Sequence, residues 1–587
     1  MSALPQPIGN LMKFIGNFLR IVTRLLRIIY LLFPAFLFFI AAWIAFWKLS
    51  QGRDVLIAML ERKGAGGIVL LAILFWSMVN WYSSRMLVYR RDIEKDSPIM
   101  GQHIPRLLGY FGFTIVWLGI LRLPVLNDPA FNAHVKTLGV WLLLGLSFGA
   151  YCLLTILFEK YKKAKLMLPV SDSDSDATIK QKQDTENRRY RILYTCIGIG
   201  VALLIALNML INSPSRAWLF FGSVILIQLC FLFFVVVRLG SGNMQMATAG
   251  TKQTNTGTFN SLGEKLFNNP DIWRQERSIF IVYQVVAVLS IAVYVYEIVN
   301  YEWSVKLGAL PTVLIAFGVL VGLFSIISFF SIVTRINFHM IILILILLFG
   351  KFFNEPHYVA TIDAKTTAPY DQRPSLKDYF FKWAERRKDD IIAARNAGNK
   401  YPVYFELADG GASRSGYWTA ITLGTLEDVT NGDFSKHLFC LSGASGGSVG
   451  NGTFLALLKA KNEVSAQKTN YTDQAARYLK SDFLSYTLAR MLGPDFVRPM
   501  FGGLPIADRA TALENALEKG EDDSAILYGK FKTAFSEYIP SDNNELPIIC
   551  VNVTRVQDGC PSVVSTMKLD ESFGQRVDIL ATMPKDK

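Results

Sequence analysis

The sequence predicts a multi-span α-helical membrane domain followed by an α/β domain. Hydrophobic residues make up 51% of the chain, and long apolar runs fill residues 28–353. Charged and polar residues return abruptly after Phe353, so the composition changes at that point. From residue 401 onward, strand-like and helical segments alternate, as they do in α/β domains. A chain of 587 residues is also long enough for more than one domain.

Nine apolar runs have about the length needed to cross a bilayer as helices. The last run is the weakest candidate, because its core from Met340 to Phe349 is also compatible with a buried strand or a half-span. Glu297 and Arg122 lie near the ends of their runs, where we expect their side chains to reach the membrane surface. The nine runs are residues 28–47, 67–82, 107–126, 138–158, 192–211, 217–237, 279–298, 307–333 and 336–353.

Residues 1–27 precede the first run and contain four basic residues and no acidic one, interleaved with apolar residues. The apolar run that follows is too long for a signal peptide and lacks an A-x-A cleavage site. The segment is therefore predicted to be a basic helix at the membrane interface. Residues 354–400 are predicted to form a linker with an amphipathic helix, Leu376 to Ala397, before the α/β domain at 401–587.

Basic residues between the runs predict the orientation of the bundle. Residues 83–106, 159–191 and 238–277 hold five, nine and five Lys+Arg, whereas 127–137, 212–216 and 299–306 hold one each. The basic connections are expected in the cytoplasm, and residues 48–66, with four, are an exception. The sequence does not decide on which side of the membrane the α/β domain lies, because this depends on how many of the last three runs cross the bilayer. The net charge of +13 on an apolar chain points to anionic lipid as the partner rather than to nucleic acid.

The stretch from His437 to Leu458 has the pattern strand, sharp turn, helix, with Ser445 at the turn. The small residues Gly443, Ala444, Gly446 and Gly447 surround this serine in a G-x-S-x-G spacing, typical of a nucleophile elbow. An overlapping match centres on Ser448, which would fall about one turn into the helix. The alternative for the whole stretch is an ordinary glycine-rich turn.

A second strand-to-helix junction lies upstream, where residues 403–408 lead into the loop Asp409-Gly410-Gly411-Ala412-Ser413-Arg414. Consecutive glycines at such a junction leave backbone N–H groups free to stabilise the oxyanion of an acyl-transfer intermediate. A phosphate-binding turn is the alternative, but the spacings G-x-G-x-x-G and G-x-x-x-x-G-K-[ST] are absent here.

None of the five histidines follows Ser445 in the chain, which excludes a triad in the order Ser, Asp/Glu, His. A serine activated directly by a carboxylate remains. The two motifs, ADGGASRSGYWTA and LSGASGGS, together resemble the patatin-like phospholipases from about Tyr401 onward. That family has a three-layer α/β fold and a catalytic Ser-Asp pair without histidine. Its loop usually has a third glycine, which is Ala412 here.

The resemblance implies a membrane-bound lipid acyl hydrolase that cleaves carboxylic esters through an acyl-enzyme on Ser445. Gly410, Gly411 and Ala412 would form the oxyanion hole, and Arg414 would order the loop or contact a lipid phosphate. No cofactor is expected, and the sequence shows no metal-ligand spacing. The alternative is a non-catalytic transporter or sensor with a degenerate or truncated domain of this kind.

The catalytic aspartate of the family lies in D-G-G or D-G-A late in the domain. Downstream of Ser445, Asp558 is the only aspartate followed by glycine, and its surroundings favour a hairpin turn. We therefore expect the base to lie beyond residue 587 and the α/β domain to be incomplete at its C-terminus.

Overall fold

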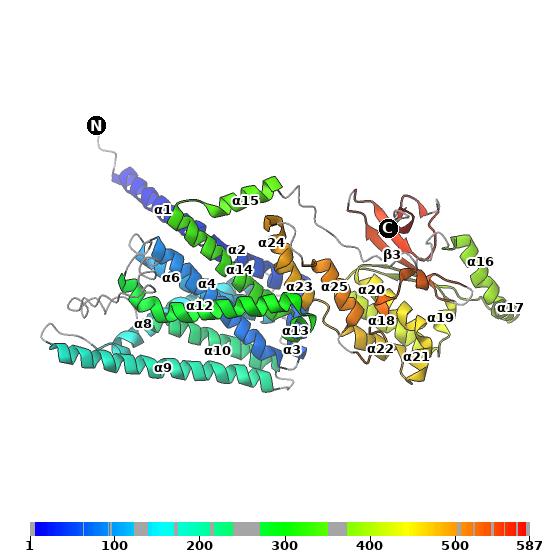
Figure 1. Ribbon diagram of the computed structural model, residues 1–587, viewed down its shortest axis with the longest axis horizontal. Coiled ribbons are helices and arrows are strands. Elements are labelled where there is room, and N and C mark those ends of the chain that lie inside the picture. Colours follow the sequence, from blue (N-terminus) through cyan, green and yellow to red (C-terminus); the bar gives the residue numbers. More distant parts are fainter. Residues whose placement is uncertain are drawn as a thin grey trace. The chain divides into compact units, whose positions relative to one another are not determined.

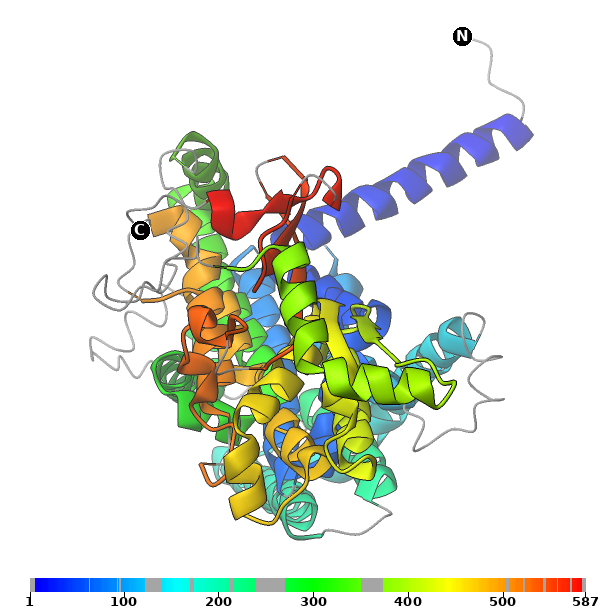
Figure 2. The same ribbon diagram turned by 90° about the vertical axis from the view of Figure 1, so that its right-hand side faces the viewer.

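The chain divides into two compact units, which are described separately. Figure 1 and Figure 2 show the ribbon from two directions. The first unit comprises Met1–Asn354 and Leu488–Ala507, and the second comprises Glu355–Thr487 and Asp508–Lys587. The computed structural model describes residues 6–62, 64–91, 93, 97–121, 139–168, 174–211, 216–238, 270–349, 373–501, 506–520, 523–541, 545–556, 558–570 and 573–582.

The first unit is a helix bundle. Within the described residues, seven helices are long and apolar enough to cross a membrane. Each coincides with one predicted run, so a multi-pass membrane protein is compatible with the structure. The seven are α4 (Ala65–Arg90), α6 (Pro98–Leu121), α8 (Val140–Tyr161), α9 (Asp176–Leu210), α10 (Arg216–Val237), α12 (Pro270–Val299) and α14 (Ala309–Thr334).

The first and last predicted spans differ from expectation. Helix α1 (Gln6–Leu31) and helix α2 (Phe33–Trp43), which continues as η1 (Ile44–Lys48), meet at a bend of 81°. Pro34 in the first turn of α2 has no N–H to continue the hydrogen bonding of α1, which accounts for the break. Helix α15 (Phe338–Phe349) has only 12 residues, fewer than the ~20 that a straight span needs.

Helix α4 lies in the core of the bundle and packs against α6 and α14. Trp76 and Trp81 of α4 are fully buried. The expectation for Glu297 of α12 was wrong: its side chain is buried and accepts a hydrogen bond from the Thr312 hydroxyl of α14 instead of reaching the surface. Arg122 lies outside the described residues. Two short helices, α3 (Ser50–Glu61) and α13 (Tyr301–Leu307), and the turn η3 (Lys162–Leu166) complete this part of the unit.

A segment from the second half of the sequence, Leu488–Ala507, also belongs to the first unit. It includes most of α23 (Ser485–Leu492) and all of α24 (Pro494–Phe501). Arg490 donates from Nε to the carbonyl of Ile298 at 2.6 Å, and the Tyr294 hydroxyl donates to the carbonyl of Ala489 at 3.0 Å. The predicted boundary at residue 401 did not anticipate this insert.

The second unit contains a five-stranded sheet in the order β1-β2-β3-β4-β5. β1–β2, β2–β3 and β4–β5 are parallel pairs, and β3–β4 is antiparallel. The apolar run LPIICVNV at 546–553 is typical of a buried parallel strand. β3 is buried in its first three residues and parallel to β2, but it is antiparallel to β4. The strands are β1 (Tyr404–Ala408), β2 (Leu438–Ala444), β3 (Ile548–Thr554), β4 (Pro561–Ser565) and β5 (Val577–Asp578).

Helices pack on both faces of this sheet. On one face, Phe454 and Leu458 of α20 (Gly446–Lys459) pack with Leu441 of β2. On the other face, Tyr379 and Trp383 of α16 (Leu376–Arg386) pack with Phe439, Ile548 and Val563. The predicted amphipathic helix 376–397 is two helices, because the helical backbone breaks at Arg387.

The remaining helices of the second unit are α17 (Lys388–Asn396), α18 (Ala412–Val429), α19 (Phe434–His437), α21 (Lys461–Ala466), α22 (Tyr471–Leu479), α25 (Arg509–Lys519), η6 (Lys530–Lys532), η7 (Phe535–Tyr538) and α26 (Ile579–Thr582).

Candidate active site

Ser445 is the single residue that connects the end of β2 to the start of α20, at the turn that the sequence predicts. Its backbone has φ 52° and ψ −122°, a conformation that non-glycine residues rarely adopt. The residue is exposed, so the sharp turn presents its hydroxyl outward. Strained backbone of this kind costs about 1–3 kcal/mol and is found preferentially at functional sites. Ser448, by contrast, lies inside α20 with its Oγ buried.

The glycines around Ser445 are required by close backbone approaches. A Cβ added at Gly443, Gly446 or Gly447 would come closer to neighbouring backbone than real Cβ atoms do. The nearest atoms would be Ser448 N at 2.7 Å, Ala412 O at 2.0 Å and Ala408 O at 2.5 Å, respectively. These contacts hold the start of α20 against both β1 and the loop before α18. The G-x-S-x-G spacing therefore has a steric cause here and is more than a flexible turn.

The loop Asp409–Gly411 connects β1 to α18 and lies beside Ser445. A Cβ added at Gly410 would be 3.2 Å from the Ser445 Cβ and 3.8 Å from its Oγ. Ala412, the first residue of α18, has φ 53°, in the region that favours glycine. The first N–H groups of a helix have no partner within the helix. The start of α18 therefore supplies backbone donors next to the serine.

Two side chains of the first turns of α18 act on this loop. The Ser415 hydroxyl donates to the carbonyl of Asp409, which closes the loop onto the helix. Arg414 is exposed in the first turn. A cation there adds to the positive end of the helix dipole instead of opposing it. Together they make the N-terminus of α18 favourable for an anion.

Sequence reasoning missed Asn552 of β3, which pairs in register with Ala444. Its Nδ2 donates to the Gly443 carbonyl at 2.9 Å and to the Ser442 Oγ at 3.1 Å. The side chain thus ties the end of β2, immediately before Ser445, to the neighbouring strand. Asn552 is a positioning residue. An asparagine near the end of a predicted buried strand was the only available signal.

Two cavities flank the end of β1. The larger, of about 860 Å³, follows α18 and includes Gly410 and Ser415 at one end and Trp418 and Leu426 along its length. The smaller, of about 420 Å³, includes Ser442, Ala444 and Asn552. Leu407, Ala408 and Asp409 line both cavities, so both lie next to the end of β1 and the start of the loop that follows it.

No carboxylate within the described residues is hydrogen-bonded to the Ser445 hydroxyl. Asp558 lies in the turn between β3 and β4, which confirms the predicted hairpin. Its carboxylate pairs with the Arg555 guanidinium, which holds the pKa of Asp558 well below its usual range. A carboxylate held in this way is a weak proton acceptor. Asp409 is exposed beside the loop and lines both cavities.

Among the described residues of the second unit, no histidine takes the place of a carboxylate base beside Ser445. His437 precedes β2, and its Nδ1 is 3.0 Å from the carbonyl of Pro402. The seven residues of β2 separate it from Ser445, and the eight steps between them span roughly 26 Å at ~3.3 Å per residue. No group of three His, Cys, Asp or Glu residues suited to a metal occurs in the described part of the chain.

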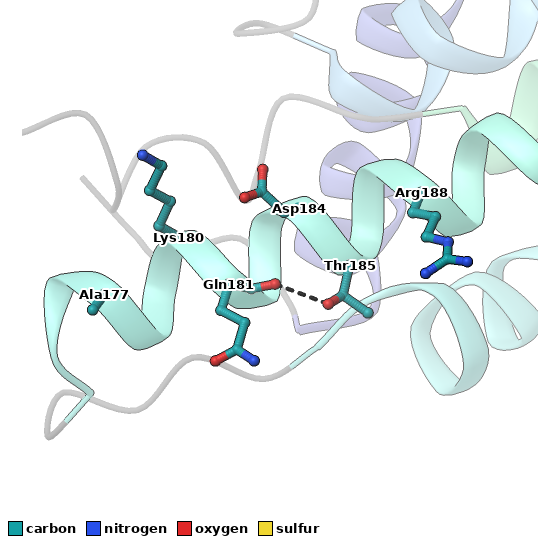
Figure 3. A pocket seen from close by; sticks show the side chains of 6 residues that line it. All are labelled: Ala177, Lys180, Gln181, Asp184, Thr185 and Arg188. Carbon is teal, nitrogen blue, oxygen red and sulfur yellow. Dashed lines mark hydrogen bonds between the residues drawn. The ribbon is translucent and has the colours of Figure 1, made fainter.

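A separate hollow of about 430 Å³ lies on the polar part of α9 (Figure 3). All six of its lining residues come from successive turns of one helix, and the figure shows a single hydrogen bond among them, from the Thr185 hydroxyl to the carbonyl of Gln181. No second element within the described residues contributes to its lining. We assign it no function.

Comparison of the chain with protein-family models, with curated proteins and with solved structures returns no match. The assignment of a function therefore rests on the site alone.

Proposed function

We propose that the second unit is a serine hydrolase of the patatin-like kind, which cleaves carboxylic esters of membrane lipids. The observation that supports the proposal most strongly is the positive φ of Ser445 at the β2–α20 junction, with Gly410 against its side chain. A glycine-rich turn without a catalytic role has no need of a non-glycine residue in this conformation.

In this mechanism the Ser445 Oγ attacks the ester carbonyl carbon, and the carbonyl oxygen becomes an oxyanion. Backbone N–H groups of Gly410, Gly411 and Ala412 would stabilise that charge, for which one donor contributes about 10²–10³ in rate. Collapse of the intermediate releases the alcohol and leaves an acyl-enzyme, which water then hydrolyses. The serine proton needs a carboxylate base. The resemblance implies an aspartate in this role.

Lipid is the proposed substrate class for two reasons. A unit joined to a helix bundle of membrane-spanning character meets its acyl substrate at high effective concentration. The 860 Å³ cavity beside Gly410 also has apolar side chains along its wall, including Trp418, Leu423 and Leu426. An acyl chain is compatible with that lining.

A fluorophosphonate probe tests the proposal, because it labels only an activated serine. We expect the wild-type protein, in a form that includes its carboxylate base, to be labelled in detergent, and Ser445→Ala to lose labelling and ester hydrolysis with an unchanged melting temperature. Ser448→Ala is the matched control and should retain both. Loss in Ser448→Ala alone would move the nucleophile to residue 448, and labelling that survives in Ser445→Ala, or is absent from the wild-type protein with its base present, would reject the proposal.

The base can be identified in the same assay. Asp558→Asn should label like the wild type, since Asp558 is already engaged by Arg555. If Asp558→Asn abolishes labelling, the hairpin carries the base and the expectation that it lies beyond residue 587 is wrong. Asp409→Asn provides the corresponding test for the loop.

A further inference from the structure

The first unit contains a buried group of cations that the proposed hydrolase does not use. Arg85, Arg106 and Arg238 are each at most 8% exposed, and Lys162 is half-buried beside them. They come from α4, α6, the end of α10 and η3. We call these four residues the cationic cluster. Lys162 interacts electrostatically with each of the three arginines, so the four form one group.

Two carboxylates in the described residues accompany the cluster. Glu276 of α12 is buried and pairs with both Arg238 and Arg85, the latter at 3.4 Å. Glu159, whose side chain is 43% exposed, lies 3.5 Å from Arg106. Among the described residues, Arg106 thus has only a partly exposed carboxylate beside it, and Lys162 pairs with a backbone carbonyl and with no carboxylate. Burying cations with so little compensation in an apolar bundle is costly unless an anion completes the group.

Unused donors point to the same conclusion. Arg106 Nε and Arg238 Nη1 are buried and make no hydrogen bond, and Arg106 Nη1 has only the ion pair with Glu159 at 3.5 Å. Arginine presents donors in a planar fork that matches phosphate oxygens. Beneath Arg238, the Trp81 ring lies 5.2 Å from the guanidinium carbon and holds it in place.

Compensation of helix dipoles does not account for the cluster. Arg85, Lys162 and Arg238 lie near the C-terminal ends of α4, α8 and α10, where a cation is favourable, and Lys162 donates to the carbonyl of Arg238 at 2.8 Å. Arg106, however, is the ninth residue of α6, more than two turns from either end, where the dipole does not favour a cation. Its position needs another explanation.

We propose that the cationic cluster binds a phosphate group at the depth of the lipid headgroups. All four residues lie at the end of the bundle that the basic connections predict to be cytoplasmic, where anionic lipids are concentrated. A phosphate monoester carries nearly two negative charges and several acceptor oxygens, which suit Arg106, Lys162 and the unused donor of Arg238. Two sources share this chemistry, a phosphatidate headgroup and free inorganic phosphate.

Thermal unfolding of the full chain in detergent tests the proposal, because a ligand that binds only the folded state raises the melting temperature. The arms contain phosphatidate, phosphatidylcholine or inorganic phosphate. Stabilisation by phosphatidate alone identifies a lipid headgroup, and stabilisation by inorganic phosphate that competes with phosphatidate identifies a general phosphate site. Equal stabilisation by phosphatidate and phosphatidylcholine, with none by inorganic phosphate, overturns the proposal.

Arg106→Gln is the first variant, because it leaves only the partly exposed Glu159 without its cation. It should weaken the affinity for phosphatidate about fivefold or more. Arg238→Gln is the second and should weaken it further. Lys163→Gln, an exposed lysine next to the cluster, controls for general attraction and should bind like the wild type. Unchanged affinity in both arginine variants, or an equal loss in Lys163→Gln, rejects the site.

Discussion

Two strained residues lie in the same site. Ser445 and Ala412 are both non-glycine residues with positive φ, at 52° and 53°. Each such residue costs about 1–3 kcal/mol and persists only where its surroundings hold it. Here the surroundings are the backbone contacts of Gly446 with Ala412. In the proposed patatin-like hydrolase, Ala412 would occupy the position of the loop's usual third glycine, and its strain would be the structural consequence of that departure.

Glu406 of β1 makes the stability of the second unit depend on pH. Burial raises its pKa to about 7. The folded state thus holds the proton more tightly than the unfolded chain. The stabilisation is fully present below pH 4.5 and is lost as the pH rises to about 7.

We therefore expect Glu406→Gln to equal the wild type near pH 4 and to exceed it at pH 8. After allowance for solvent screening, the gain in unfolding free energy should be about 1 kcal/mol. Melting temperatures measured from pH 4 to 8 check this, with the exposed Glu385→Gln as control. A difference between Glu406→Gln and wild type that does not vary with pH would contradict it.

At the scale of secondary-structure elements, the candidate site is formed by two strand-to-helix junctions. β1 leads through Asp409–Gly411 into α18, and β2 leads through Ser445 into α20. Because β1 and β2 are parallel neighbours, with Ala408 opposite Gly443, both helices begin at the same edge of the sheet. Two helix N-termini and their free N–H groups therefore converge near the serine.

Gly410→Val tests the loop. Its Cβ would lie 3.2 Å from that of Ser445, so the added methyl groups should block substrate and lower turnover at least tenfold. Gly410 is exposed, and we expect little change in melting temperature.

Gly452→Ala is the control for this loop variant. The nearest atom to its Cβ would be 3.8 Å away, and alanine within α20 should add about 1 kcal/mol of stability with normal turnover. Normal turnover in Gly410→Val would remove the loop from the active site. Gly411 is less suitable for this test, because a Cβ there would lie 2.8 Å from the Ser415 Cβ and disturb the loop itself.

At the scale of the whole molecule, the insert Leu488–Ala507 indicates on which side of the membrane the chain continues after residue 507. Arg490 binds the carbonyls of both Ile298 and Ala507, at 2.6 Å each. Both ends of the insert are thus held near Val299, the end of α12 that the connection 299–306 follows. The chain leaves the first unit toward residue 508 at this end.

Because that connection holds one basic residue, we expect residue 508 and those following it to lie outside the cytoplasm. Single cysteines at Glu302, Thr185 and Ser541, all exposed, can be placed in a background without native cysteines. In intact cells an impermeant thiol reagent should label Glu302→Cys and Ser541→Cys but not Thr185→Cys. Labelling of Ser541→Cys together with Thr185→Cys would reverse the assignment.

The sequence by itself determined the features that depend on neighbouring residues. A helix in a bilayer must satisfy its own backbone hydrogen bonds, so apolar runs of sufficient length predicted the seven long helices. The elbow at Ser445 was also predictable, since glycine spacing directly restricts the local backbone. The hairpin at Asp558 followed from its turn residues in the same way.

Only the tertiary structure decided which distant segments meet. The pattern of an amphipathic helix shows that it needs a partner but does not specify which one, so the packing of Leu488–Ala507 against α12 was not predictable. The burial of Glu297 depends on Thr312 of another helix, and the role of Asn552 depends on the register of β2 with β3. The cationic cluster likewise assembles from four separate elements. In each case the deciding contact joins residues far apart in the chain, and its energy has no signature in the local sequence.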